Sequence, residues 1–143
     1  VAQVRAALDA GADVLAHTPR EELPADLLGR MRGKWVISTL RAYAVEPSRL
    51  RALVAAGAKV AYGTDLGNEG TAPGIDEGEL SLLQEAGVDP LVAATAAGAE
   101  LLGLRDHGRL AVGSAARVLA VRGLSPAELA RPVWVMIDGR MVV

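Results

Sequence analysis

Short apolar runs alternate with amphipathic stretches along the first hundred residues. Three runs rich in apolar and β-branched residues predict strands, and each is followed by a stretch with helical spacing of apolar positions. The predicted strands are 13–17, 34–40 and 59–62. The predicted helices are 1–10, about 18–32, 47–57, about 76–86 and 90–102. This order predicts an α/β fold with a parallel sheet, right-handed crossovers and helices that cover the sheet.

Local signals set the ends of these helices. Thr18-Pro19 followed by Glu21 has the form of a capping box with proline at the first helical position, so a helix is expected to begin there. Pro47 and Pro90 also suit first helical positions. Gly11, Gly57 and Gly103 are the expected stop signals.

The pattern changes after Gly103. The segments 108–113, 117–121 and 133–137 are expected to be extended, and Ser125 is expected to cap a short helix. Asp138-Gly139 between two apolar runs predicts a tight hairpin, with 140–143 returning antiparallel. We therefore divide the chain into residues 1–103, an α/β part, and residues 104–143, part of a small β subdomain.

Composition narrows the function classes. Of 143 residues, 51% are apolar and 22% charged, and the net charge is −2 without a block of one sign. Neither nucleic acid nor an anionic membrane surface is an expected partner, and a small-molecule substrate fits better. The uncharged runs are far shorter than the roughly 20 residues of a membrane span, and no export signal is evident, so we expect a cytoplasmic protein.

The absence of cysteine limits the metal chemistry open to this chain. It excludes disulfides, thiolate zinc sites and a cysteine nucleophile. The two histidines are His17 and His107, so a metal site would need Asp or Glu as well.

Asp65 is the first candidate for chemistry. It follows the predicted strand 59–62 directly, and α/β enzymes place working groups at the carboxyl ends of parallel strands. Gly63 and Gly67 allow a sharp turn and leave room beside the carboxylate. A structural role for Asp65, as a cap or an Asx turn, is an equally open interpretation.

His17 occupies the same relative place after the run 14–16. A histidine and an aspartate at the ends of two strands of one sheet would point to the same rim, where they could form half of a metal site. A single histidine at a strand end is more often a hydrogen-bonded structural residue, and the pair is more informative than either residue alone.

Other polar residues are weaker candidates. Four acids, Glu69, Asp76, Glu77 and Glu79, could supplement a metal site, but a charged loop and first helical turn usually form a solvated face, which is the interpretation we favour. Gly63, Gly67 and Gly70 do not match a phosphate-binding fingerprint. His107 is expected to be a surface or hinge residue.

Taken together, three segments resemble the carboxyl-terminal part of the amidohydrolase superfamily, most closely its imidazolonepropionase-like and prolidase-like members. They are ALDAGADVLAHTP, which resembles the helix and sixth barrel strand ending in a histidine; AYGTDLG, which resembles the eighth strand with its metal-binding aspartate; and ATAAGAELLGLRDHGRLAVGSAARVLAV with VWVMIDGRMVV, which resembles the passage from the last barrel helix into the small β domain. The resemblance covers nearly the whole chain.

The resemblance implies a partial (β/α)8 barrel, about its last three β/α units, followed by the small β subdomain. It also implies a metal-dependent hydrolase with one or two divalent ions, zinc foremost, in which metal-activated water attacks an amide, cyclic amide or dipeptide-like C–N bond. In that scheme Asp65 ligates metal and accepts the proton of the water, and His17 ligates a second metal or orients substrate.

Several features of the family have no counterpart here. The His-x-His pair of the first strand, the lysine of the fourth and the histidine of the fifth precede the matched region in the family, and a histidine frequent beyond the eighth strand is replaced by Asp76. Three strands cannot close a barrel. The start at Val1, inside a predicted helix, favours a piece of a longer enzyme that is inactive alone and needs the missing amino-terminal part of the barrel or an oligomeric partner.

Two other functions remain open. The chain could be a non-catalytic α/β remnant that pairs its open sheet with another chain as an interaction or oligomerisation module. A weaker interpretation takes the glycine loop as a phosphate or nucleotide site.

Overall fold

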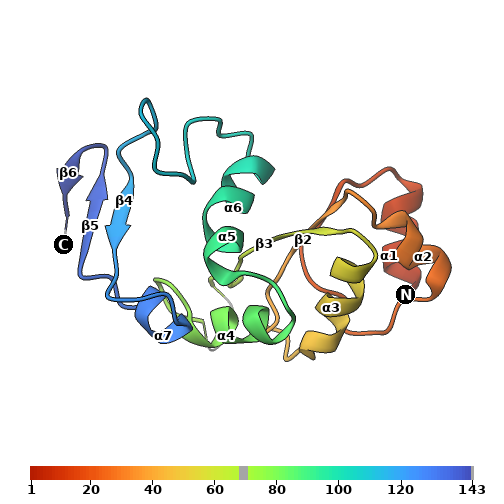
Figure 1. Ribbon diagram of the computed structural model, residues 1–143. Coiled ribbons are helices and arrows are strands. Elements are labelled where there is room, and N and C mark those ends of the chain that lie inside the picture. The colour runs from red at the N-terminus through yellow and green to blue at the C-terminus, as the bar shows by residue number, and fades with distance from the viewer. Residues whose placement is uncertain (68–70, 143) are drawn as a thin grey trace.

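The computed structural model describes residues 1–67 and 71–142 and contains two three-stranded sheets (Figure 1). The first sheet is parallel, in the order β1-β2-β3, and its strands alternate with helices along the chain. Its elements are α1 (Ala2–Asp9), β1 (Val14–Leu15), α2 (Ala25–Arg30), β2 (Trp35–Ile37), α3 (Pro47–Ala55) and β3 (Lys59–Ala61). The predicted parallel α/β arrangement is confirmed, with shorter strands than the apolar runs suggested.

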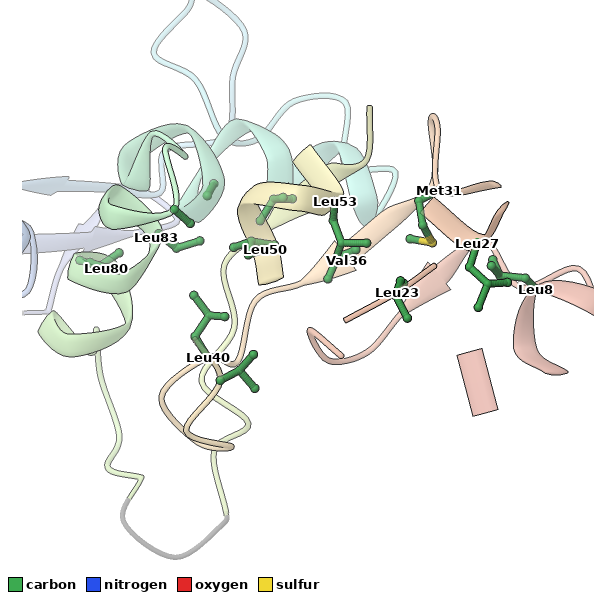
Figure 2. Packing of buried hydrophobic residues seen from close by; sticks show 14 of the residues in the cluster. Leu8, Leu23, Leu27, Met31, Val36, Leu40, Leu50, Leu53, Leu80 and Leu83 are labelled. Carbon is green, nitrogen blue, oxygen red and sulfur yellow. The ribbon is translucent and has the colours of Figure 1, made fainter. Parts of the chain in front are cut away.

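The core lies between this sheet and its helices. Leu15, Val36 and Val60 are neighbours in register across the three strands and pack on the covered face. Leu50 and Leu53 of α3 are fully buried beside Val36 (Figure 2). Each such side chain contributes about 1.5–3 kcal/mol through removal from water. The buried leucines of α1, α2 and α4 extend the same cluster along the chain.

The helix predicted from residue 18 begins later, at Ala25. The hydroxyl of Thr18 donates to the Ser38 carbonyl, 2.8 Å away, so it is not available as a helix cap. Pro24 occupies the N-cap position, and a proline disfavours helical backbone in the residue that precedes it. The capping-box prediction at Thr18 was therefore wrong, because a tertiary contact engages the capping hydroxyl.

Three helices follow the first sheet: α4 (Glu77–Glu85), α5 (Pro90–Ala94) and α6 (Ala96–Leu101). The single helix predicted over 90–102 is divided at Thr95, whose φ and ψ of −127° and −88° are not helical. The Thr95 hydroxyl donates to the Leu91 carbonyl at 2.6 Å. Side-chain bonds of this kind commonly accompany bends in helices.

The second sheet is an antiparallel meander near the carboxyl end. It comprises β4 (Val118–Ala120), β5 (Trp134–Ile137) and β6 (Arg140–Met141), with α7 (Pro126–Leu129) between β4 and β5. The hairpin prediction is confirmed: Asp138 and Gly139 have φ of 49° and 78°, as a type I′ turn requires. Residues 108–113, predicted as extended, form bends and turns instead.

The second sheet lies at one end of the molecule and α1 and α2 at the other, and α4, α5 and α6 lie between the two sheets (Figure 1). Helix α7 packs against α4, and Arg131 donates to Glu77 at 2.8 Å beside that contact. The division at residue 104 stays a prediction. Among the described residues, no helix is both long enough and apolar enough to cross a membrane.

Glu79 is a fully buried acid on the first turn of α4. Its carboxylate accepts the backbone N–H groups of Leu40 at 3.0 Å and Arg41 at 2.7 Å. The prediction of a solvated Glu79 was therefore wrong. A carboxylate can be buried at tolerable cost only when it is hydrogen-bonded, and these two donors fix the loop after β2 to α4.

Asp76 caps the same helix. Its carboxylate accepts the Glu79 N–H at 2.9 Å and pairs with Arg41 at 2.5 Å, and its own N–H donates to the Tyr62 hydroxyl at 2.8 Å. Burial opposes ionisation, but the hydrogen bonds from Arg41 and from backbone N–H groups outweigh it, so the pKa of Asp76 is lowered. Asp76 is thus a structural cap rather than a solvated acid.

We expect Glu79→Gln to lower the free energy of unfolding by about 1.5–3 kcal/mol, because an amide nitrogen would replace one acceptor oxygen opposite a buried N–H donor. Urea denaturation followed by circular dichroism measures the change. Glu85→Gln, on the exposed side of α4, is the matched control and should shift stability by less than about 0.5 kcal/mol. Equal stability of Glu79→Gln and wild type would contradict the assignment.

Asp76→Asn tests the lowered pKa. The folded-state pKa lies below the ordinary value of 3.8, so the ionised group stabilises the fold above that value, and the contribution is lost as the pH falls below it. Asparagine keeps the helix cap but does not titrate. The free energy of unfolding of the variant should therefore fall less steeply than that of wild type as the pH drops below about 4. Parallel slopes for the two proteins would refute this account.

Candidate functional site

His17 lies just past β1, at the carboxyl end of the parallel sheet. Its ring nitrogen Nδ1 makes a hydrogen bond with the hydroxyl of Thr39, which follows β2, at 3.1 Å. The neighbouring Thr18 N–H and hydroxyl both donate to the Ser38 carbonyl, at 3.4 Å and 2.8 Å. The polypeptide after β1 is thus tied to the polypeptide after β2, and these bonds fix one side of the imidazole.

Asp65 lies past β3, at the same end of the same sheet. Because β1, β2 and β3 run parallel, His17, Thr39 and Asp65 all lie at the carboxyl end of the sheet. Asp65 is partly buried at this end of the sheet.

Tyr43 joins His17 to Asp65. Its hydroxyl donates to Asp65 Oδ2 at 2.6 Å, and its ring packs against the His17 ring with centroids 4.6 Å apart and planes inclined at 55°. The common rim predicted for the histidine and the aspartate is therefore present, with a tyrosine from the loop after β2 between them. Whether either residue binds metal stays a prediction.

Backbone contacts at this edge require small side chains. The Thr39 N–H donates to the Gly63 carbonyl at 3.1 Å, and the Gly63 N–H donates to the buried Ser38 hydroxyl at 3.2 Å. A Cβ atom on Gly63 would lie 2.3 Å from Cγ2 of Ile37. Glycine is thus needed at position 63 for close approach, two residues before Asp65.

The residues of the rim also have unusual backbone conformations. Thr39 and Asp65 have φ of 44° and 53°, a left-handed region that is costly for a β-branched residue and that aspartate adopts more readily than most residues with a side chain. Ala44, next to Tyr43, has φ of 48°. Such conformations persist where surrounding contacts fix them, and they are frequent at functional sites.

One imidazole and one carboxylate form a partial donor set for a divalent cation. Zinc accepts both ligand types, and the Nδ1 contact of His17 is of the kind that orients ligating histidines. Catalytic zinc sites usually take three protein ligands. Within residues 1–67 and 71–142 there is no group of three or more His, Cys, Asp or Glu side chains that could hold a metal ion. The described residues therefore supply at most two of the three ligands of such a site.

Of the four other candidate acids, the three that the structure describes have partners other than His17 and Asp65. Asp76 and Glu79 serve α4 and the loop after β2, and Glu77 pairs with Arg131. Glu69 and Gly70 lie outside the described residues. After Gly67 the next described helix begins at Glu77, so this loop does not lead directly into a helix as a phosphate-binding loop would.

His107 lies apart from the rim, on the segment after α6. It is half-buried, and its Nδ1 contacts Asp106 at 2.7 Å. That contact is the main cause of the lowered pKa of Asp106. His107 also borders an open cavity of about 640 Å³ with Glu100 and Arg105 among its lining residues. It is thus a partly buried connector residue, less exposed than the sequence suggested.

Sequence reasoning missed Tyr43, Thr39 and the buried role of Glu79. Tyr43 carried a weak signal, since the chain has only two tyrosines and no phenylalanine, and this one follows a strand. Thr39 and Glu79 carried none, because their roles depend on partners from other elements.

The fold is similar to that of known amidohydrolases. A crystal structure of an amidohydrolase matches 99% of this chain at 23% identity, with a TM-score of 0.76. A crystal structure of a prolidase complexed with N-methylphosphonate-L-proline matches 97% at 20% identity, with a TM-score of 0.80. This chain spans 42% of each of those chains.

Sequence comparison agrees with this likeness. No curated protein matches the chain. The profile of the amidohydrolase family, however, matches residues 41–142, which include Tyr43, Asp65 and the whole second sheet. The chain therefore belongs to the amidohydrolase family.

Proposed function

We propose that this chain forms the carboxyl-terminal part of a metal-dependent hydrolase that cleaves a C–N bond in a small molecule. The observation that carries the proposal is the linked trio His17, Tyr43 and Asp65 at the carboxyl edge of a parallel sheet, in a chain of the amidohydrolase family. Parallel α/β enzymes place their catalytic residues at the carboxyl ends of the strands.

The architecture that would complete this site is a (β/α)8 barrel. Three consecutive strand–helix units with parallel neighbours in chain order are what one segment of such a barrel contains. No further strand of the described chain pairs with the outer edges of β1 or β3. We propose that strands from the rest of the complete protein, or from an oligomeric partner, pair with these edges and bring the remaining ligands.

The chemistry follows from the two donors at the rim. A bound divalent cation, zinc by the ligand types present, would activate water and polarise the carbonyl under attack. An Asp65 carboxylate oxygen would take the proton of the attacking water and later deliver it to the departing nitrogen. His17 would hold a cation or orient the substrate, with its ring direction fixed by Thr39.

Among C–N substrates, the structural likeness favours a dipeptide-like molecule. The prolidase of similar fold was crystallised in complex with N-methylphosphonate-L-proline. Amides and cyclic amides are the other members of the proposed class. Residues 1–143 alone, with two of the required ligands, are expected to be inactive.

Asp65→Asn tests the proposal in the complete protein that contains this chain. Asparagine can still accept the Tyr43 hydrogen bond but cannot take a proton, so kcat on a panel of dipeptides, N-acyl amino acids and cyclic amides should fall by about 10²–10⁴-fold. Metal content by mass spectrometry should fall as well. Asp13→Asn is the matched control, because Asp13 is exposed at the opposite, amino end of β1, and its activity should stay at the wild-type level.

Wild-type turnover in Asp65→Asn would refute the role of Asp65. A complete protein that is folded, metal-free and inactive on the whole panel, yet oligomeric by light scattering, would instead favour the non-catalytic interaction module.

A further inference from the structure

Tyr43 contacts both candidate ligands although it belongs to neither of their strands. It lies in the loop after β2, between the segments that carry His17 and Asp65. Its hydroxyl reaches Asp65 Oδ2 at 2.6 Å, a length typical of a charge-assisted O–H···O⁻ bond. Its ring packs against the imidazole of His17 in a tilted arrangement, with centroids 4.6 Å apart. One side chain thus constrains two groups that are 48 residues apart in the sequence.

The loop that carries Tyr43 is held independently of these contacts. The Val45 N–H donates to the Leu40 carbonyl at 2.9 Å and the Ala44 N–H to the Arg41 carbonyl at 3.2 Å, so the loop closes on itself. The buried Glu79 carboxylate accepts hydrogen bonds from the backbone N–H groups of Leu40 and Arg41, and Val45 is itself buried. The backbone on either side of Tyr43 is therefore held by contacts that do not involve Asp65.

Asp65, by contrast, has a backbone that needs support. Its φ of 53° lies in a region that is sparsely populated for residues with a side chain, so surrounding contacts must maintain its conformation. The Tyr43 hydroxyl supplies a directional contact from a rigid loop. A carboxylate that must be placed within a fraction of an ångström for metal binding benefits from such a partner.

We propose that Tyr43 is a positioning residue, which orients the Asp65 carboxylate through its hydroxyl and the His17 imidazole through its ring in the proposed metal-dependent site. The inference rests on the proposed function and extends it to a residue that acts through Asp65 and His17. Partners of this kind typically change metal affinity by about 10–100-fold when they are removed.

The chain offers a matched control in its second tyrosine. Tyr62 is partly buried, lies next to Gly63, and its hydroxyl accepts the Asp76 N–H at 2.8 Å. Tyr62→Phe removes a hydroxyl hydrogen bond that supports structure, whereas Tyr43→Phe removes the one that reaches Asp65 and keeps the ring against His17. A general loss of stability would affect both variants alike.

The experiment measures zinc affinity of the complete protein by competition with a chromophoric chelator, for wild type, Tyr43→Phe, Tyr62→Phe and Asp65→Asn. Thermal unfolding of each variant ensures that affinity is measured on folded protein. We expect Tyr43→Phe to weaken zinc binding at least about tenfold, and Tyr62→Phe to bind within about threefold of wild type. At saturating zinc, Tyr43→Phe should lower kcat more than it changes KM, because a misplaced Asp65 impairs chemistry rather than substrate binding.

Three results would overturn the inference, and they are distinguishable. If Asp65→Asn loses zinc while Tyr43→Phe binds within about threefold of wild type, Tyr43 has no positioning role and the proposed function stands. If wild type and Asp65→Asn both fail to bind zinc, the proposed function fails and the role of Tyr43 fails with it. Equal weakening in Tyr43→Phe and Tyr62→Phe would also refute the inference, since it would indicate a structural effect alone.

Discussion

The buried carboxylate of Glu79 is the constraint on which the geometry of the rim depends. It takes two backbone N–H groups from the start of the loop after β2, and it does so from the first turn of α4, a helix nearly forty residues further along the chain. Without those acceptors the loop would have two donors unpaired, and that of Leu40 would be buried. These two hydrogen bonds fix the start of the loop relative to α4, and Tyr43 contacts Asp65 from this loop. The adjacent Asp76, which caps α4 and pairs with Arg41, strengthens the same junction.

The second requirement is close approach of the three strand ends. Ser38 is fully buried between the segments after β1 and β3, where its carbonyl accepts from Thr18 and its hydroxyl accepts the Gly63 N–H. Gly63 has no room for a Cβ atom. Short polar groups and a glycine therefore replace the apolar packing that holds the rest of the sheet. The sheet remains ordered past its last ladder bonds, and the side chains of His17, Thr39 and Asp65 emerge from positions that are fixed by backbone contacts.

This arrangement explains why a partial donor set can still be informative about function. An imidazole and a carboxylate on neighbouring surface loops would be unremarkable if either could move freely. Here each is in contact with the same tyrosine, one is also bonded to Thr39, and the backbone of the other is in a left-handed conformation. Preorganisation of this kind costs stability, and it is the expected property of groups that must hold a cation or receive a proton in one geometry.

The sequence by itself determined the order of strands and helices, the Asp138-Gly139 hairpin, the helix starts at Pro47 and Pro90, and the placement of His17 and Asp65 just past parallel strands, because these depend on local periodicity and turn chemistry. It also carried the family likeness. Only the tertiary structure decided that Thr18 bonds to Ser38 instead of capping a helix, that residues 108–113 are not a strand, that Glu79 is buried, and that Tyr43 joins the two candidate groups. Each of these depends on a partner distant in sequence or on packing that no local pattern encodes, and a hydrogen bond or ring contact between such partners exists only once the chain has folded.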